Sequence, residues 1–163
     1  MAKEHSFDIV CNIDMQVVRN VIDQAMREIK TRYDLKGTIT EMKLEENNIK
    51  ILSDDDYKLK SVIDILKGRL VKNKISLKAL EFGQVETASM SHVRQNIALQ
   101  AGIPTDKAKE IVKFIKQMKN KVQGQIQKDQ VRVVGKDIDT LRAVMDEIKQ
   151  KDWGIETQFV NYR

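Results

Sequence analysis

The chain has 163 residues, of which 41% are hydrophobic and 33% charged, with a formal net charge of +5, one proline and seven glycines. This composition excludes a disordered or fibrous protein, and no stretch approaches the ~20 uncharged apolar residues of a membrane span. Because there is one cysteine, and because Met1 to Ser6 contain no apolar leader, the expected location is the cytoplasm and no membrane partner is expected.

Positive charge is concentrated in the second half of the chain. Residues 1–82 contain 15 Lys and Arg against 14 Asp and Glu, whereas residues 83–163 contain 14 against 10. Clustered cations raise the local concentration of phosphates, so this asymmetry favours an anionic partner.

The first half predicts the order strand, helix, strand, strand, helix, strand. Phe7, Ile9 and Cys11 alternate as in a half-buried strand, and a stripe at helical spacing follows over 17–29. Strands are predicted at 38–44 and 49–53, a second helix over 59–70, and a closing strand near 79–82.

The second half repeats this order. An alternating strand is predicted at 93–99, a helix over 108–118, strands at 122–127 and 131–135, a helix over 141–148 and a closing strand at 157–162. Residues 48–66 align with 130–148 without a gap, apolar position on apolar position, at an offset of 82 residues. The chain is therefore an internal tandem repeat.

This element order predicts the α+β class, with two tandem ferredoxin-like (βαββαβ) domains built on antiparallel sheets. The expected boundaries are 1–90 for the first domain and 91–163 for the second. In this fold two helices cover one face of each sheet and the other face stays open, available for a ligand or a partner. The sequence leaves open whether the first strands are exchanged between the copies.

The strand at 122–127 predicts one candidate binding surface. Lys121, Gln123 and Gln125 alternate with apolar positions, and Arg132 points the same way from the neighbouring strand. Such side chains reach phosphate oxygens and base edges, although a merely solvated sheet face has the same pattern. Neither 49–53 nor 131–135 contains an aromatic residue, which argues against base stacking on those strands.

A second candidate is the segment from Arg32 to Gly37, which places Arg32, Asp34 and Lys36 in a loop. Loops on a rigid scaffold often carry binding residues. The alternative is a helix end, in which the two cations complement the helix dipole and Gly37 permits the turn. Arg163, at the C-terminus, is the last candidate.

No catalytic constellation is visible in the sequence. His5 and His92 lack a metal-ligand spacing, and a single cysteine, expected in the core, cannot build a zinc site of the usual kind. The run of three aspartates at 54–56 is more typical of a helix cap than of a calcium loop. No enzyme activity, metal or cofactor is expected.

Several motifs together resemble the YajQ family of small bacterial proteins over essentially the whole chain. They are Ser6-Phe-Asp-Ile-Val, Arg32-Tyr-Asp-Leu-Lys-Gly, Leu77-Lys-Ala-Leu-Glu-Phe-Gly, Val93-Arg-Gln, Lys121-Val-Gln-Gly-Gln-Ile-Gln, Gln130-Val-Arg-Val and Gln158-Phe-Val-Asn-Tyr-Arg. The resemblance implies two ferredoxin-like domains, nucleotide binding and, for some members, a link to cyclic di-guanylate signalling, with no catalytic residues. The family pattern usually has Phe at Leu35 and Ala at Gly124.

The leading hypothesis is a non-catalytic nucleotide-binding protein whose ligand is a nucleotide, a cyclic dinucleotide such as cyclic di-GMP, or RNA. Cations would contact phosphates through charge-assisted hydrogen bonds, and glutamines would contact sugar or base. The competing hypothesis is a protein-interaction adaptor that contacts a regulator and binds no nucleotide. The candidate site residues are Arg32, Asp34, Lys36, Lys121, Gln123, Gln125, Arg132 and Arg163.

Overall fold

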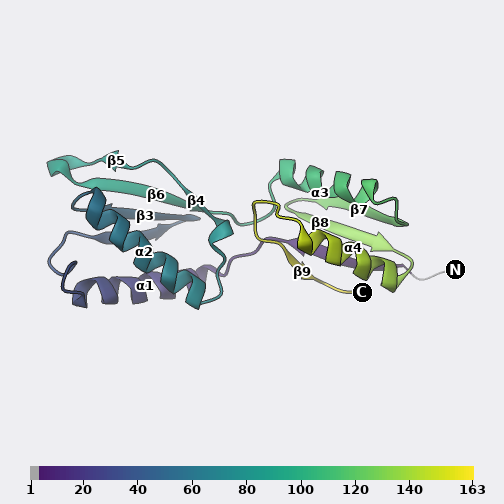
Figure 1. Ribbon diagram of the computed structural model, residues 1–163, viewed down its shortest axis with the longest axis horizontal. Coiled ribbons are helices and arrows are strands. Elements are labelled where there is room, and N and C mark those ends of the chain that lie inside the picture. Colours follow the sequence, from purple (N-terminus) through teal and green to yellow (C-terminus); the bar gives the residue numbers. More distant parts are fainter. Residues whose placement is uncertain (1–3) are drawn as a thin grey trace. The chain divides into compact units, whose positions relative to one another are not determined.

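The computed structural model describes residues 4–163 and has the α+β class predicted from the sequence, with two antiparallel sheets that each carry helices (Figure 1). The chain forms two compact units. The central unit is residues 13–100, and the terminal unit combines residues 4–12 with 101–163. None of the described helices is long and apolar enough to cross a membrane.

The central unit contains a sheet in the strand order β2-β3-β6-β4, with the two-residue strand β5 pairing with β6. Two 17-residue helices pack on it, and their apolar stripes form one core with the inward side chains of the strands. The elements are α1 (Met15–Thr31), β2 (Glu41–Glu45), β3 (Asn48–Ser53), α2 (Asp56–Lys72), β4 (Leu80–Phe82), β5 (Glu86–Thr87) and β6 (Val93–Leu99).

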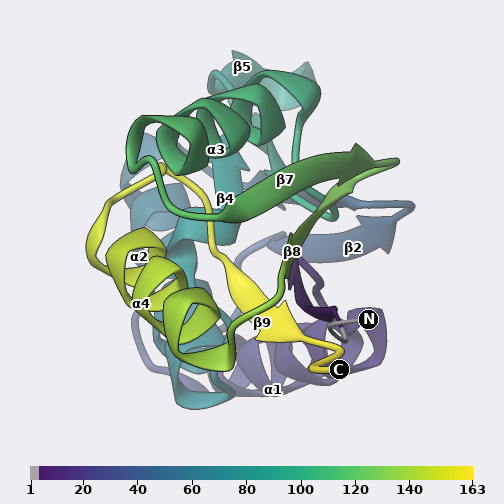
Figure 2. The same cartoon turned by 90° about the vertical axis from the view of Figure 1, so that its right-hand side faces the viewer.

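The terminal unit contains a sheet in the order β7-β8-β1-β9. Two 13-residue helices lie on the same side of this sheet, as Figure 2 shows. Together with the inward face of the strands they bury a second core. The elements are β1 (His5–Val10), α3 (Thr105–Gln117), β7 (Val122–Gln127), β8 (Gln130–Gly135), α4 (Ile138–Gln150) and β9 (Gln158–Val160).

The first strand of each repeat pairs within the other repeat's sheet. β1 pairs antiparallel with β8 and β9, and β6 pairs antiparallel with β3 and β4. The compact units therefore differ from the contiguous domains 1–90 and 91–163 expected from the sequence, because each expected domain contains a strand that pairs outside it. The question of strand exchange, which the sequence leaves open, is answered by these two registers.

Side-chain caps explain where three of the helices begin. Asp14 accepts a hydrogen bond from the backbone N–H of Gln16, and Asp55 accepts one from that of Lys58. Asp137 does the same at the start of α4. An Asp at this position satisfies one of the unpaired N–H groups of the first turn and places negative charge at the positive end of the helix. The predicted capping role of the 54–56 run is confirmed for Asp55.

Candidate functional site

The helix-free face of the terminal sheet carries most of the predicted binding residues. In the strand register Gln125 lies opposite Arg132, which in turn lies opposite Asp8. The neighbouring row runs from Gln123 through Val134 to Ser6. Because paired residues of adjacent strands point to the same face, these rows place amides and a guanidinium side by side. We call this surface the amide face.

An ion pair lies in the middle of the amide face. Arg132 donates from Nε to Asp8 Oδ1 at 2.9 Å and from Nη2 to Oδ2 at 3.3 Å. Asn161 Nδ2 donates to the same Oδ2 at 2.9 Å. Asp8 is only 1% exposed, whereas the side chain of Arg132 is 30% exposed. The pair therefore fixes the guanidinium by one edge and leaves part of it facing solvent.

The pKa of Asp8 reflects these contacts. The hydrogen bond from Arg132 lowers it most; burial opposes this, and the hydrogen bond from Asn161 and the charges of Arg132 and Arg163 lower it further. The net pKa lies below the usual value of 3.8. Asp8 is therefore a carboxylate at neutral pH, and by the same interaction the pKa of Arg132 is raised.

The C-terminal residues are held against β1. Arg163 and Ser6 exchange two backbone hydrogen bonds, at 3.0 and 3.3 Å. Asp8 pairs with Val160. Between the Asp8–Val160 pair and the Ser6–Arg163 pair, the C-terminal segment therefore has one residue more than β1, and Asn161 has a positive φ of 56°. This geometry is that of a β-bulge, which re-aims side chains at the end of a strand. It brings Asn161 to Asp8 and Arg163 to the amide face.

A polar hollow of about 810 Å³ lies where β7 begins and β8 ends. Three lysines line it, Lys119, Lys121 and Lys136, together with Gln123. Its acidic residues are Glu4 and Asp137. The Asp137 carboxylate already accepts hydrogen bonds from the Asp139 backbone and the Thr140 hydroxyl. The hollow is therefore net cationic and continuous with the amide face through Gln123.

The remaining predicted residues belong to the central unit. Arg32 Nε contacts Asp34 Oδ1 at 2.9 Å, and Lys36 Nζ lies 5.3 Å from the centre of the Tyr33 ring. Buried Leu35 anchors this loop in the core. The structure thus divides the predicted site: Lys121, Gln123, Gln125, Arg132 and Arg163 lie in one unit, whereas Arg32, Asp34 and Lys36 lie in the other.

The corresponding sheet face of the central unit has a different charge pattern. Lys50 pairs with Glu45 at 2.7 Å, and Arg94 pairs with Glu86 at 3.1 Å. Asn96 Nδ2 donates to Asn48 Oδ1 across the strands. Since its cations are matched by nearby carboxylates, this face offers less attraction to an anion than the amide face.

Sequence reasoning missed Asp8, and it did not connect Lys119 and Lys136 with Lys121. An acidic residue between the buried Phe7 and Ile9 could have signalled a paired carboxylate, because a lone charge is costly at such a position. Among residues 4–163, no group of three or more His, Cys, Asp or Glu is placed to hold a metal ion.

Residues 5–163 match the family described as "Nucleotide-binding protein YajQ-like". The chain belongs to this family. Similar proteins include the "Nucleotide-binding protein" of Citrifermentans bemidjiense, 56% identical over 158 residues, with 97% of this chain and 98% of that protein covered. The "Nucleotide-binding protein Acid345_2028" of Koribacter versatilis is 54% identical over 160 residues, with 98% of both chains covered. That of Desulfitobacterium hafniense is 50% identical over the full length of both.

The match confirms the family resemblance inferred from the sequence motifs. It covers both units, including the amide face and the cationic hollow, and these three relatives are bacterial proteins of the same length or nearly so. The names of these relatives refer to nucleotide binding and to no catalytic activity.

Proposed function

We propose that this protein is a non-catalytic nucleotide-binding protein whose ligand lies on the amide face and in the adjoining cationic hollow. The observation that carries the proposal is the continuity of three lysines, two glutamines and a fixed arginine on one unit. The family description and the names of the similar proteins support the ligand class.

In this proposal the lysines of the hollow contact phosphate. Lys119, Lys121 and Lys136 supply ammonium groups around a space of about 810 Å³, which falls within the range of small-ligand sites. Hydrogen bonds between ammonium and phosphate are charge-assisted and are roughly twice as strong as neutral ones. The hollow is therefore the anchor for the anionic part of the ligand.

The amide face would then contact sugar and base. Each glutamine side chain offers two donors and an acceptor, so Gln123 and Gln125 can pair with base edges. Arg132 uses Nε and Nη2 for Asp8, which leaves the Nη1 hydrogens for a base or a phosphate oxygen. Asp8 acts here as a positioning residue, because it holds the guanidinium and is itself buried.

For the finer identity we propose a cyclic dinucleotide such as cyclic di-GMP, with RNA as the alternative within the same chemistry. A cyclic dinucleotide carries two phosphates and two bases on a compact ring, which suits a hollow joined to a hydrogen-bonding face. Isothermal titration with cyclic di-GMP, mononucleotides and short RNAs separates these ligands. An RNA ligand predicts a log–log salt slope of about 0.7 per phosphate contacted.

The decisive variants are Lys121→Gln and Gln123→Ala, with Lys60→Gln in the central unit as a matched charge control. We expect Lys121→Gln to weaken binding at least about tenfold, as the loss of one charge-assisted hydrogen bond would do. Gln123→Ala should weaken it by a smaller factor, because a neutral hydrogen bond is lost. The control should bind as the unaltered protein does. Unchanged isotherms for both site variants would exclude this surface as the nucleotide site.

Arg132→Ala is a poor test on its own, because it would leave the buried Asp8 carboxylate with a single side-chain donor, Asn161. A buried charge without its partner destabilises the fold and would confuse binding with unfolding. Arg132→Lys keeps a cation beside Asp8 and removes the planar fork. We expect this variant to remain folded and to bind the nucleotide more weakly.

We also propose that each unit is ferredoxin-like. When β1 is read as the first strand of the terminal unit and β6 as that of the central unit, both sheets have the order second, third, first, fourth. This is the strand order of the split βαβ arrangement. The repeat would then be two equivalent units whose first strands have changed places.

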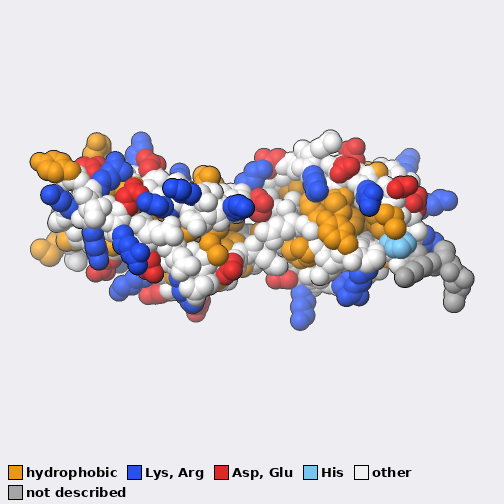
Figure 3. Space-filling model, turned by 90° about the horizontal axis from the view of Figure 1, so that it is seen from below, with side chains coloured by type: hydrophobic (Ala, Val, Ile, Leu, Met, Phe, Trp, Pro, Cys, Tyr) orange, Lys and Arg blue, Asp and Glu red, His pale blue; other side chains and the backbone are white. Residues whose placement is uncertain are grey.

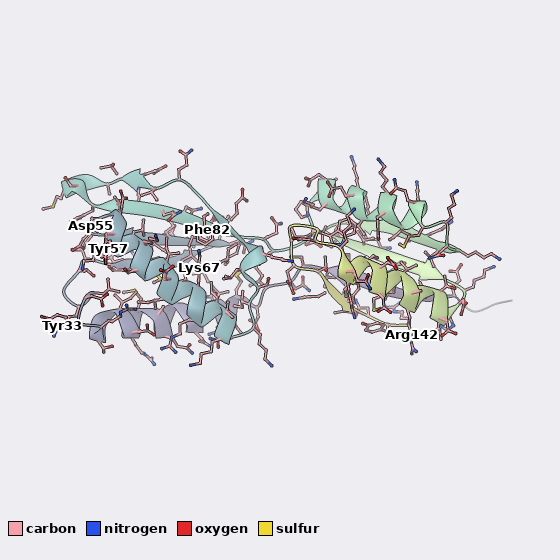
Figure 4. All side chains as sticks on the ribbon, viewed as in Figure 1. Tyr33, Asp55, Tyr57, Lys67, Phe82 and Arg142 are labelled. Atoms are coloured by element: carbon pink, nitrogen blue, oxygen red, sulfur yellow. The ribbon has the colours of Figure 1, made fainter. Side chains whose placement is uncertain are left out.

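A protein-interaction adaptor is the second candidate, and exposed tyrosines on the central unit favour it. Tyr33 is 89% exposed and Tyr57 is 76% exposed, and Figure 4 labels both. The loop that carries Tyr33 is tied to α2, since Lys58 Nζ donates to the Asp34 carbonyl oxygen at 2.7 Å. Tyrosine is enriched in protein interfaces. If no nucleotide shifts the melting temperature and Tyr33→Ser abolishes capture of a cellular protein, this function replaces the first.

A further inference from the structure

A second hollow of about 720 Å³ lies on the helix side of the terminal sheet, where α4 faces the start of β1 and the C-terminal residues. Figure 3 shows a cluster of hydrophobic side chains on this unit with cationic side chains at its edge. We call this hollow the apolar cavity. Its residues differ from those of the amide face except near the chain ends, where Ser6 and Arg163 also line it.

The cavity follows from the short edge strand. β9 ends at Val160 and pairs only with Asp8 to Val10, so the first half of β1 is flanked by the bulged residues 161–163. The helix α4 meanwhile presents Ile138, Leu141 and Met145 along one side, at helical spacing. Because the sheet narrows beneath this part of the helix, space remains between them.

Apolar and aromatic groups form most of the wall. Phe7 is 1% exposed and faces the cavity from β1, and Leu141 and Met145 face it from α4. Tyr162 also lines the cavity, and its hydroxyl lies 3.8 Å from the sulfur of Met145. A planar ring placed in this space would contact an aromatic ring, a thioether and a leucine, all favourable partners for a flat apolar body.

A guanidinium lies at the rim. Arg142 follows Ile138 by one turn of α4, lines the cavity and is exposed, and Figure 4 labels it. Within residues 4–163, the structure shows no ion pair that involves Arg142. Asp146, one turn further along α4, also lines the cavity, but it forms no ion pair with Arg142 in the structure. The fork of the Arg142 guanidinium can therefore bind the carboxylate of a ligand through two parallel hydrogen bonds.

We propose that the apolar cavity binds a small molecule with a planar apolar body and a single carboxylate. The body lies against Phe7, Leu141, Met145 and Tyr162, and the carboxylate contacts Arg142. A volume of about 720 Å³ fits a drug-sized ligand, and pockets of this kind are mostly apolar with a few placed polar groups. This site is separate from the proposed nucleotide site and does not depend on it.

The test uses two probes that differ in charge, 2-naphthoate and the neutral 2-naphthalenemethanol, on the full-length protein. Titrations are followed by the carbon-13 methyl signal of Met145 and by calorimetry. We expect 2-naphthoate to shift the Met145 signal and to bind more tightly than the neutral probe. Absence of a shift at Met145 with saturating 2-naphthoate would overturn the proposal.

Two variants test the contacts. Arg142→Gln should weaken 2-naphthoate binding at least about tenfold and leave the neutral probe unaffected, whereas Arg19→Gln, on the exposed side of α1, should change neither. Ile138→Glu places a carboxylate at the cavity mouth, where the first turn of α4 tolerates negative charge, and should prevent anion binding without unfolding.

The readout also separates the two sites. Arg142→Gln should bind nucleotide with the affinity of the unaltered protein. Lys121→Gln should bind 2-naphthoate with the affinity of the unaltered protein. Equal binding of 2-naphthoate to Arg142→Gln and the unaltered protein would refute the role of Arg142. Concentration-dependent dimerisation that Ile138→Glu abolishes would show that the cavity is an interface between copies of the chain, and would also refute the proposal.

Discussion

The exchange of first strands predicts which fragments of the chain can fold. The fragment 13–100 contains every strand of the central sheet, including β6, which pairs with both β3 and β4. The fragment 1–90 has the same number of residues to within a few but lacks β6. We therefore expect 13–100 to fold alone and 1–90 to remain unfolded, although 1–90 is the contiguous repeat that the sequence suggests.

The loss of stability in fragment 1–90 can be estimated from the side chains that β6 buries. Val93, Ile97 and Leu99 are between 0% and 8% exposed. Burial of each such side chain contributes about 1.5–3 kcal/mol, so their loss removes about 5–9 kcal/mol before any hydrogen bond of the sheet is counted. A small domain has a total stability of about 5–15 kcal/mol, and this loss is therefore sufficient to unfold it.

Circular dichroism with urea titration, and the dispersion of amide signals in a nitrogen-correlated spectrum, distinguish the two fragments. A cooperative transition for 13–100 and none for 1–90 is the expected result. The terminal unit offers the reciprocal test, because 101–163 lacks β1 with its buried Phe7 and Ile9. This fragment should become ordered only when a peptide of residues 4–12 is added. Cooperative unfolding of 1–90 with the midpoint of 13–100 would refute the strand pairing described above.

Three further predictions concern single residues. Because the Arg132 hydrogen bond holds the pKa of Asp8 below 3.8, the Asp8 contacts stabilise the fold above that pH and are lost as the pH falls through the lower folded value. Between about pH 5 and about pH 2, the urea midpoint of the unaltered protein should therefore fall more than that of Asp8→Asn. The control Asp23→Asn, on an exposed helix surface, should show the same dependence of the urea midpoint on pH as the unaltered protein. Gly124→Ala should stabilise by about 0.5 kcal/mol in thermal unfolding, because the unfolded chain loses conformational freedom. The new Cβ would lie 3.2 Å from Ile115 and 3.3 Å from Val112, so these side chains must shift by a few tenths of an ångström; a clear loss of stability would show that α3 cannot yield. Gly102→Ala should destabilise the fold by about 2 kcal/mol, because Gly102 has a φ of +91° and the new Cβ would lie 2.6 Å from the Asp129 carboxylate. An unchanged melting temperature would contradict the expected destabilisation.

The surfaces of the two units differ in chemistry despite the shared repeat. The terminal unit holds both hollows for which we propose ligands, together with the ion pair of Asp8 and Arg132. The central unit pairs the cations of its open sheet face with carboxylates and exposes Tyr33 and Tyr57 instead. A division between a ligand-binding unit and a partner-binding unit would reconcile the two candidate functions, and the variants Lys121→Gln and Tyr33→Ser test its two halves separately.

Local pattern was sufficient to predict the class of this protein and the order of its helices and longer strands, although the two-residue strand β5 was not predicted. Alternation at Phe7 and Ile9, and the helical stripe of 17–29, specify which side of each element is apolar, because the periods of strand and helix are properties of the backbone itself. The same patterns placed Gln123, Gln125 and Arg132 on one face of a sheet, and the register confirms that Gln125 and Arg132 are neighbours.

Tertiary structure alone decided which strands meet. β1 and β6 both have alternating apolar side chains, so nothing in their periodicity selects a partner. The site depends on that choice: Asp8 reaches Arg132 only because β1 lies beside β8, 124 residues away in sequence. Pairings this distant arise from packing of the whole chain, whereas the sequence patterns report only on residues a few positions apart.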